Sequence, residues 1–355
     1  MTGDRPASDV AEPLVSVIVL NYNGARWLER CLHSLRAQTI FDQLEVIVAD
    51  NASGDGSERL GKQIVEGWPR GRFLPHGRNV GYCEGNNRAA DTARGQYLFF
   101  LNNDTWLEPG CLERLVAEAQ RAGAAAAGPL VLDYEDDRFQ SLGAFGYDVF
   151  GLACTRASSA ETREVLMPEG CAYLVSRKLF GEVGGFDPEF FMFVDEFDLS
   201  WRVWVSGHRA IAVPSARLHH RGAAQANPAG GGATVEFRTS DTKRFYTNRN
   251  SLLALLKNAR CFLLALVPLQ LCLLAVEALA ALLFVRRWSF VKRAYLGAVA
   301  DCWRLRGHIR AERRRLQRFR RRGDLFMLRF LRWRLNRWDE LQRVRRYGAP
   351  KVTPA

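Results

Sequence analysis

The sequence has no Cys-x-x-Cys pair, although it contains eight cysteines. They are scattered along the chain at positions 31, 83, 111, 154, 171, 261, 272 and 302. Structural zinc sites and small disulfide-rich domains use closely spaced cysteines, so this distribution argues against both classes. We therefore expect reduced thiols and a cytosolic environment.

A basic segment followed by an apolar run is missing from the beginning of the chain, which therefore does not resemble a secretory signal peptide. Residues 1–13 are polar instead, and we expect them to form a flexible tail.

Acidic residues are scarce in the last third of the chain. Residues 251–355 contain 24 Lys and Arg against 6 Asp and Glu (+18), whereas residues 1–250 contain 26 against 32 (−6). The partner of the last third should therefore be anionic.

Apolar residues make up 48% of the 355 residues, which excludes a wholly disordered protein. Strands are predicted at 15–20 and 44–49, with leucines at helical spacing between them. A strand–helix–strand unit is almost always right-handed and makes its strands parallel. A third strand, at 97–101, is apolar throughout and therefore predicted to be covered on both faces. We predict an α/β fold with a mostly parallel sheet.

Each of these three strands is followed by polar side chains. The three sets are Asn21 and Asn23, Asp50 and Asn51, and Asn102, Asn103 and Asp104. Asp and Asn are ordinary turn formers, so one such set alone favours a turn. The carboxyl ends of parallel strands meet at one edge of a sheet, however, and open α/β sheets bind ligands there. An acidic residue at that edge can hold a divalent cation, which in turn neutralises a diphosphate.

A Gly- and Asn-rich loop at 78–87 opens a helix predicted to reach Ala93. Backbone N–H groups of such a loop, together with an arginine, can bind phosphate oxygens. Its candidate ligand-binding residues are Arg78, Asn79, Gly81 and Asn86. The loop can equally be built only to turn the chain.

Two further clusters of ionisable residues follow. Asp195, Glu196 and Asp198 begin a predicted helix. The helix dipole favours a carboxylate there by ~0.3–1 kcal/mol, but three acids in four positions exceed what capping requires and suggest chemistry. His219 and His220 follow a strand that we expect to end at Val213. Such a pair is either a surface feature or a source of metal ligands.

Taken in order, these segments resemble family 2 glycosyltransferases of the GT-A fold. The likeness is strongest to the rhamnosyltransferase-like bacterial members that build cell-surface polysaccharide, and it spans residues 14–250. The segments that carry it are 15–24, 50–57, 79–87, 102–105, 184–187, 195–202 and 219–222.

The resemblance implies transfer of a sugar, with inversion, from a nucleotide-diphosphate donor to an acceptor hydroxyl. Asp50 and Asn51 correspond to the pair that faces the base and ribose. Asn102-Asn103-Asp104 stands in place of the family's Asp-x-Asp motif, with Asp104 as the carboxylate that binds Mg2+ or Mn2+ and Asn102 in place of the first Asp.

The resemblance also assigns the two later clusters. His219 is the better match to the family's histidine metal ligand, with His220 beside it. Asp195-Glu196 lies where the family has Glu-Asp, so the catalytic base is Glu196 by position or Asp195 by residue type. We favour Glu196, and Asp198 would orient the helix or the acceptor.

These parts suit the chemistry of glycosyl transfer. A cation stabilises the departing diphosphate, and a carboxylate on the other side of the sugar takes the proton from the acceptor. Processive members of the family carry a Gln-x-x-Arg-Trp motif. The Arg-Trp pairs at 287–288, 332–333 and 337–338 have no Gln three residues before the Arg, which favours single addition.

Residues 261–284 are 24 mostly apolar residues, a helix of ~36 Å that is long enough to cross a bilayer core of ~30 Å. Pro268 is predicted to break the helix, while Gln270 and Glu277 are costly in hydrocarbon. A single crossing would also export a tail of charge +18, against the positive-inside tendency. We expect a helix or kinked helix pair embedded in the inner leaflet with both ends cytoplasmic. The alternative is a buried hairpin of a soluble protein.

Residues 286–346 combine arginines with apolar residues at helical spacing, a pattern typical of helices on anionic membrane surfaces. The apolar positions are Leu305, Ile309, Leu316, Phe319, Leu331, Leu335, Trp338 and Leu341. The arginine triplets at 313–315 and 320–322 suit nucleic acid as well. The apolar segment upstream favours lipid, so no nucleic-acid partner is expected.

We therefore predict a GT-A catalytic domain at 14–250 and a basic, helical, membrane-associating region at 251–355. The expected location is the cytoplasmic face of the cell membrane, as a peripheral or monotopic protein. The expected partners are a nucleotide-diphosphate sugar, a lipid-linked or glycan acceptor and the anionic membrane surface. The sugar suggested by the resemblance is rhamnose from a dTDP donor. The alternative is a catalytically degenerate transferase fold that serves as a nucleic-acid-binding or scaffold protein.

Overall fold

The computed structural model describes residues 12–155, 159–222, 238–348 and 351–353. At its centre is a ten-stranded sheet, one half of which is parallel. The parallel strands, in spatial order, are β4 (Tyr97–Asn102), β1 (Val15–Asn21), β2 (Leu44–Asp50) and β3 (Gly71–Pro75). The strands predicted at 15–20, 44–49 and 97–101 are all present, whereas β3 was not predicted.

The other half of the sheet is mixed. The strand β11 (Ala172–Ser176) is antiparallel to both β4 and β6 (Ala126–Asp133), and β12 (Ala210–His220) runs parallel to β6. Short strands at its margins are β5 (Thr105–Leu107), β7 (Phe139–Ser141) and β10 (Arg163–Glu164), and a separate pair is formed by β8 (Ala144–Tyr147) and β9 (Ala153–Thr155). The predicted α/β class with a mixed, mostly parallel sheet is confirmed.

Helices cover both faces of the sheet. They are α1 (Leu28–Arg36), α2 (Ser57–Glu66), α3 (Gly81–Thr92), α4 (Cys111–Ala122), α5 (Arg177–Val183) and α6 (Asp195–Val205), with short 3-10 turns at η1 (Phe41–Gln43) and η2 (Pro188–Phe190). Side chains alternate along β1: Val17 and Val19 pack with α1 and α4, whereas Ile18 packs with α3 and α6. The helix α4 ends at Ala122, because Gly123 adopts the left-handed conformation that stops a helix.

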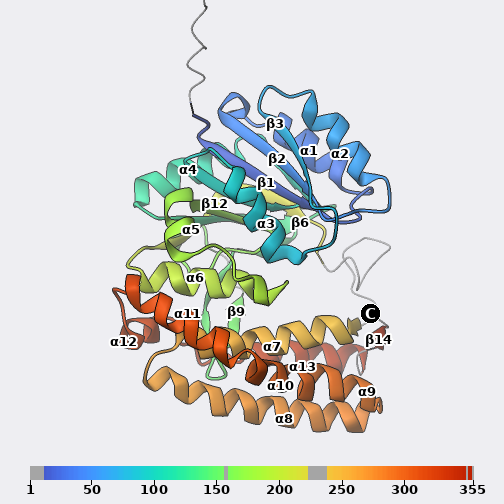
Figure 1. Cartoon of the computed structure of the whole chain (residues 1–355), viewed down its shortest axis with the longest axis vertical. Helices are drawn as coiled ribbons and strands as arrows, with labels where there is room; N and C mark the ends of the chain where they lie inside the picture. The colour runs from blue at the N-terminus through green and yellow to red at the C-terminus, as the bar shows by residue number, and fades with distance from the viewer. Residues whose placement is uncertain (1–11, 156–158, 223–237, 349–350, 354–355) are drawn as a thin grey trace, which may run out of the picture.

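The remaining chain forms a layer of helices beneath α6 (Figure 1). Its elements are β13 (Arg238–Ser240), α7 (Asp241–Asn258), η3 (Phe262–Ala265), α8 (Leu266–Phe284), α9 (Trp288–Val291), the π-helical turn η4 (Lys292–Gly297), α10 (Ala298–Arg304), α11 (Arg306–Phe319), α12 (Asp324–Met327), η5 (Leu328–Phe330), α13 (Asn336–Tyr347) and β14 (Lys351–Thr353). The boundary expected at residue 250 falls inside α7.

This helical layer shares a hydrophobic core with the sheet domain. Leu253 of α7 and Leu316 of α11 belong to the same buried cluster as Trp201 and Trp204 of α6. Trp204 also contacts Phe330 at a ring-centroid distance of 4.7 Å. The sheet domain and the C-terminal helical layer are therefore packed as one body.

Two expectations for the C-terminal region are wrong. Pro268 does not break the apolar helix, because it lies in the first turn of α8, where a missing N–H costs little. The apolar side chains Ile309 and Leu316 of α11 face the protein core, so this helix does not present them to a membrane.

Several arginines of the two triplets bind backbone carbonyls. Arg313 donates to the carbonyl oxygens of Leu256 and Ala259, at 2.7 and 2.6 Å, at the C-terminal end of α7. Arg322 donates to the carbonyl oxygens of Gly207 and His208, at 2.7 and 2.9 Å, just beyond α6. These cations satisfy carbonyls at helix C-termini and so hold the helical layer to α6.

Candidate active site

The three polar strand ends meet at one rim of the sheet. Asn21 is aligned with Asp50 on β2, and Leu20 is aligned with Asn102 on β4. The amide of Asn21 donates to Asp50 Oδ1 at 2.8 Å, while its oxygen accepts a hydrogen bond from Asn103 Nδ2, also at 2.8 Å. The rule that parallel strands end together therefore places these residues at one edge.

The side chains after β2 brace the surrounding loops. Asp50 is buried and accepts hydrogen bonds from the N–H and hydroxyl of Ser53, at 2.9 and 2.7 Å. Asn51 is also buried and donates to the carbonyl oxygen of Gly81 at 3.1 Å, which ties the β2 loop to the start of α3. Asn23 accepts from the N–H of Gly54 at 2.9 Å.

The loop before α3 uses most of its polar groups internally. Asn79 Oδ1 accepts the N–H of Gly81 at 2.9 Å, and Asn86 donates to the carbonyl oxygen of Tyr82 at 2.9 Å. Gly81 has φ of 86°, and a Cβ here would lie 2.5 Å from the Phe191 ring, so only glycine fits. Arg78 is exposed at the same loop.

Asp104 lies beside His220 at the end of β12. The Oδ1 atom of Asp104 is 3.5 Å from Nε2 of His220. His220 Nδ1 lies 2.8 Å from Oε1 of Gln140, an oxygen that only accepts, so Nδ1 carries a hydrogen and Nε2 is the ring nitrogen that faces Asp104. Burial opposes ionisation of Asp104, but hydrogen bonding and the charge of His220 outweigh it and lower the pKa of Asp104.

This pair suits a divalent cation. Two adjacent ligand atoms that each lie about 2.1 Å from an octahedral ion are roughly 3 Å from each other. This spacing is close to the 3.5 Å between Oδ1 of Asp104 and Nε2 of His220. Gln140 orients the histidine from behind, as partners of metal-binding histidines do. Gln140 belongs to the short strand β7 and was not among the candidate site residues identified from the sequence.

His219 faces the opposite side of β12. The two histidines are part of the strand, which was expected to end at Val213, and side chains alternate along a strand. His219 stacks on Trp106 at 3.7 Å. The structure therefore brings His220 to Asp104, whereas the resemblance favours His219 as the metal ligand.

His219 does belong to a second group of possible ligands, with Glu108 and Asp137. Its Nε2 atom lies 3.5 Å from Glu108 and 3.8 Å from Asp137. Arg217, however, forms ion pairs with both acids, at 3.0 and 3.3 Å. Because one guanidinium already pairs with both carboxylates, a cation would have to displace Arg217 in order to bind to this group.

Glu196 lies at the same rim as the strand ends. A Cβ added at Gly170 would be 3.1 Å from Cδ of Glu196, and the next residue, Cys171, accepts the N–H of Asn102 at 2.9 Å. Asp195 is buried, whereas Glu196 is partly exposed. Burial, and then the charge of Asp195, raise the pKa of Glu196; burial also raises the pKa of Asp195.

Asp198 belongs to a buried ionic network between α6 and α7. It pairs with Arg202 at 2.8 Å and with Lys257 at 3.1 Å, and it accepts a hydrogen bond from Asn258 at 2.8 Å. All of these groups are buried. Asp198 thus helps to hold α6 against α7. Its expected role, to orient the helix or the acceptor, stays a prediction.

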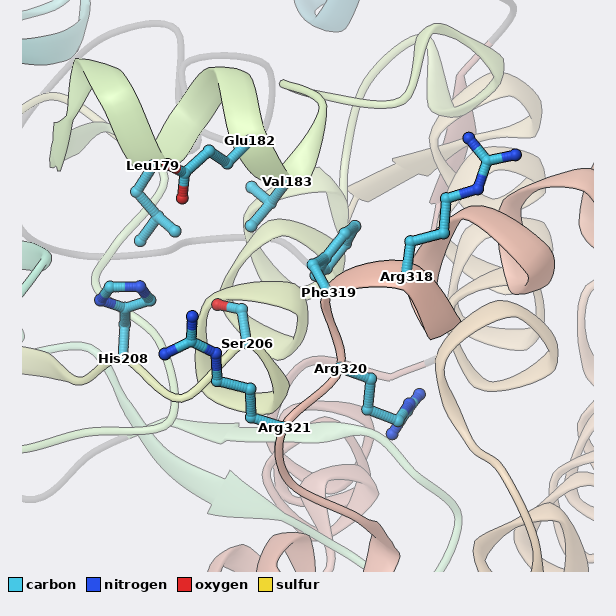
Figure 2. Close-up of a pocket in the computed structure, with 9 residues that line it drawn as sticks. All are labelled: Leu179, Glu182, Val183, Ser206, His208, Arg318, Phe319, Arg320 and Arg321. Atoms are coloured by element: carbon cyan, nitrogen blue, oxygen red, sulfur yellow. The ribbon is translucent and has the colours of Figure 1, made fainter.

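A cavity of about 220 Å³ lies elsewhere, at the other end of α6 (Figure 2). His208 and Arg321 point into it, whereas Arg318 and Arg320 point away. The cavity is lined by Ser206, beyond the C-terminal end of α6, while Glu196 lies at the N-terminal end. It is therefore separate from the candidate active site.

Solved structures with the same fold are glycosyltransferases. The chain matches GalNAc-T7 with UDP, GalNAc and Mn2+ at a TM-score of 0.55 and 18% identity, over 69% of this chain and 48% of that one. It also matches the mannosyltransferase PcManGT from Pyrobaculum calidifontis, in complex with GDP-Man and Mn2+. That match has a TM-score of 0.50 and 18% identity, and it covers 88% of this chain and 87% of that one. The fold is thus that of a GT-A glycosyltransferase.

Sequence comparison defines the family. The model of Glycosyl transferase family 2 matches residues 16–184. A relative in Mycobacterium tuberculosis named N-acetylglucosaminyl-diphospho-decaprenol L-rhamnosyltransferase is 31% identical over 59% of this chain and 76% of its own length. The O-antigen biosynthesis protein RfbC of Myxococcus xanthus is 30% identical over 60% of this chain and 18% of its own length. The chain belongs to glycosyltransferase family 2, which confirms the resemblance and identifies the protein as a glycosyltransferase.

Proposed function

We propose that the protein transfers a single sugar, with inversion, from a nucleotide-diphosphate donor to a lipid-linked acceptor in cell-envelope polysaccharide synthesis. One observation carries this proposal: Asp104 and His220 form a pair suited to a cation at the rim where Glu196 also lies. The donor's diphosphate and the acceptor's hydroxyl need these two kinds of group on either side of the transferred sugar.

Each residue of the rim has a role in this proposal. Asp104 and His220 would hold Mg2+ or Mn2+, which supplies positive charge to the departing diphosphate. Glu196 takes the proton of the acceptor hydroxyl, and its raised pKa makes it a stronger base than an ordinary carboxylate. Asp50 and Asn51 bind the nucleoside, and Arg78 contacts a phosphate.

The relatives suggest the substrates. The Mycobacterium tuberculosis relative is named for rhamnose transfer to a diphosphodecaprenol-linked N-acetylglucosamine. We infer rhamnose from a dTDP donor and a sugar linked to polyprenol diphosphate as acceptor. The chain lacks the Gln-x-x-Arg-Trp motif of processive synthases, which supports addition of one residue.

A product assay tests the proposal. Purified full-length protein is mixed with dTDP-rhamnose, N-acetylglucosaminyl-diphospho-polyprenol and Mg2+ or Mn2+, and the lipid product is analysed by mass spectrometry. We expect one added deoxyhexose, which disappears with EDTA or with Glu196→Gln. Turnover that persists without a divalent cation contradicts the metal role, and undiminished turnover by Glu196→Gln contradicts the base.

We also propose that the outer face of α8 docks on the membrane. Within the described residues, one helix, Phe262–Phe284, is long and apolar enough to cross a bilayer. Its polar side chains turn inward: Gln270 is buried, and Glu277 pairs with Arg337 at 2.6 Å and with Arg244 at 3.9 Å. The exposed side chains are apolar and include Leu269, Leu271, Val276, Leu279, Leu282, Leu283 and Phe284.

This arrangement favours a helix that lies in the membrane surface over one that crosses it. Figure 1 shows α8 as the outermost helix of the layer, alongside α7. A crossing would carry Arg244 of α7 and Arg337 of α13 into hydrocarbon together with Glu277, at a high energetic cost. Exposed Arg286, Arg287 and Lys292 follow the end of α8 and suit anionic lipid at the cytoplasmic face.

A further inference from the structure

The loop before the catalytic acids has an unusual backbone. Three of its residues that are not glycine adopt positive φ: Phe191 at 60°, Phe193 at 68° and Val194 at 64°. Such values are rare for any L-residue and rarest for a β-branched one such as Val194. Asp195 and Glu196 follow at once. Strained conformations of this kind persist only where surrounding groups hold them.

One buried side chain in α7 contacts this loop at three points. The amide nitrogen of Asn250 lies 2.9, 2.8 and 2.8 Å from the carbonyl oxygens of Phe190, Met192 and Phe193. Asn250 is fully buried. Its amide oxygen accepts the N–H of Arg249 Nε at 2.9 Å, which fixes the direction in which the amide donates. Three of the loop's carbonyl oxygens thus accept from a side chain of α7, outside the loop.

The same loop is also hydrogen-bonded to the helix α3, on the side of the site where the nucleotide sugar is proposed to bind. The carbonyl oxygen of Phe191 accepts the N–H groups of Tyr82 and Cys83, at 2.6 and 3.2 Å, in the first turn of α3. The Phe191 ring stacks on Tyr246 of α7 at 5.2 Å. The loop therefore contacts both α3 and α7, and so links these two helices.

We propose that Asn250 is a positioning residue, which holds the strained loop at 190–194 so that the N-terminus of α6 presents Glu196 to the acceptor. The inference rests on the proposed role of Glu196 as base. The ionic network of Asp198 with Lys257 fixes α6 one turn further along. Asn250 fixes the entrance to the helix, where a small displacement moves the base itself.

Asn248 offers a matched control. It lies on the same helix, is equally buried, and donates to the carbonyl oxygen of Ala294 at 2.9 Å, within the helical layer. Asn248→Ala and Asn250→Ala thus remove the same chemical group from the same helix. Only the second change removes bonds to the loop before Glu196.

Two measurements on the full-length protein test the proposal. In hydrogen exchange followed by mass spectrometry, Asn250→Ala should speed exchange in peptides covering 190–196, and Asn248→Ala should leave those peptides protected. In turnover of dTDP-rhamnose with Mg2+ and the polyprenol-linked acceptor, Asn250→Ala should lower kcat by ~100-fold with little change in the donor KM, as expected for a displacement of about 1 Å. Equal effects of the two variants in either measurement overturn the proposal.

A second substitution separates positioning from loss of fold. Val194→Gly removes the β-branched side chain at positive φ, so in the Asn250→Ala background it should restore kcat by about tenfold, because glycine adopts this conformation without help. Absence of any recovery contradicts the proposal. Failure of the proposed function is recognised separately: Glu196→Gln would retain activity, while the exchange difference between Asn250→Ala and Asn248→Ala would remain.

Discussion

The outer face of α8 gives a quantitative prediction for membrane binding. Leu279 and Leu283 lie one turn apart and are 59% and 61% exposed. Complete burial of a leucine side chain stabilises by ~1.5–3 kcal/mol, so insertion of the exposed part of each contributes about 1–2 kcal/mol. The double substitution Leu279→Glu with Leu283→Glu should remove about 2–4 kcal/mol, a roughly 30- to 1,000-fold loss of affinity.

Sedimentation with phosphatidylcholine vesicles containing phosphatidylglycerol measures this affinity. Leu325→Glu is the matched control, because Leu325 is 77% exposed but lies on the short helix α12. We expect the control to bind as the unaltered protein does, and both variants to melt at its temperature. Equal vesicle binding by the double variant and the control would refute docking through α8.

Three further predictions concern the active site and its support. Glu196→Gln should lower kcat by ~10²–10⁴-fold while nucleotide binding, followed by thermal shift, is retained. Because the base must be ionised and burial raises the pKa of Glu196, turnover should fall as pH decreases. In a pH–rate profile this fall should be centred above the usual pKa range of carboxylates, and a fall centred near pH 4 would contradict the prediction. Asp198→Asn should destabilise the fold by about 3–5 kcal/mol, measured by denaturant unfolding, since it leaves Arg202 buried without its carboxylate and Lys257 with Asp187 alone; an unchanged midpoint would contradict it.

The sequence was informative where local rules determine the structure. Parallel strands end at one edge, so the meeting of Asn21, Asp50 and Asn102 followed from three apolar runs and the residues after them. The start of α6 at Asp195 followed from its acids. Membership of glycosyltransferase family 2 followed from the order of the motifs.

Long-range packing was beyond the same reasoning. The choice between His219 and His220 depends on the register of β12, which extends to both residues. Gln140 reaches His220 only because β7 pairs beside β6, and no periodicity marks it. The basic triplets suggested a polyanion, but Arg313 and Arg322 bind carbonyls at the ends of α7 and α6, contacts that arise only once the helices are packed.

The central claim is that Asp104 and His220 hold a cation against the donor's diphosphate. Thermal unfolding of the full-length protein with UDP, GDP or dTDP, each with and without Mn2+, tests it most directly. At 100 times its Kd a ligand adds ~2.7 kcal/mol of stability, so one nucleotide should raise the melting temperature only when Mn2+ is present, and not in Asp104→Asn. An equal rise without Mn2+, or an undiminished rise in Asp104→Asn, would contradict the account.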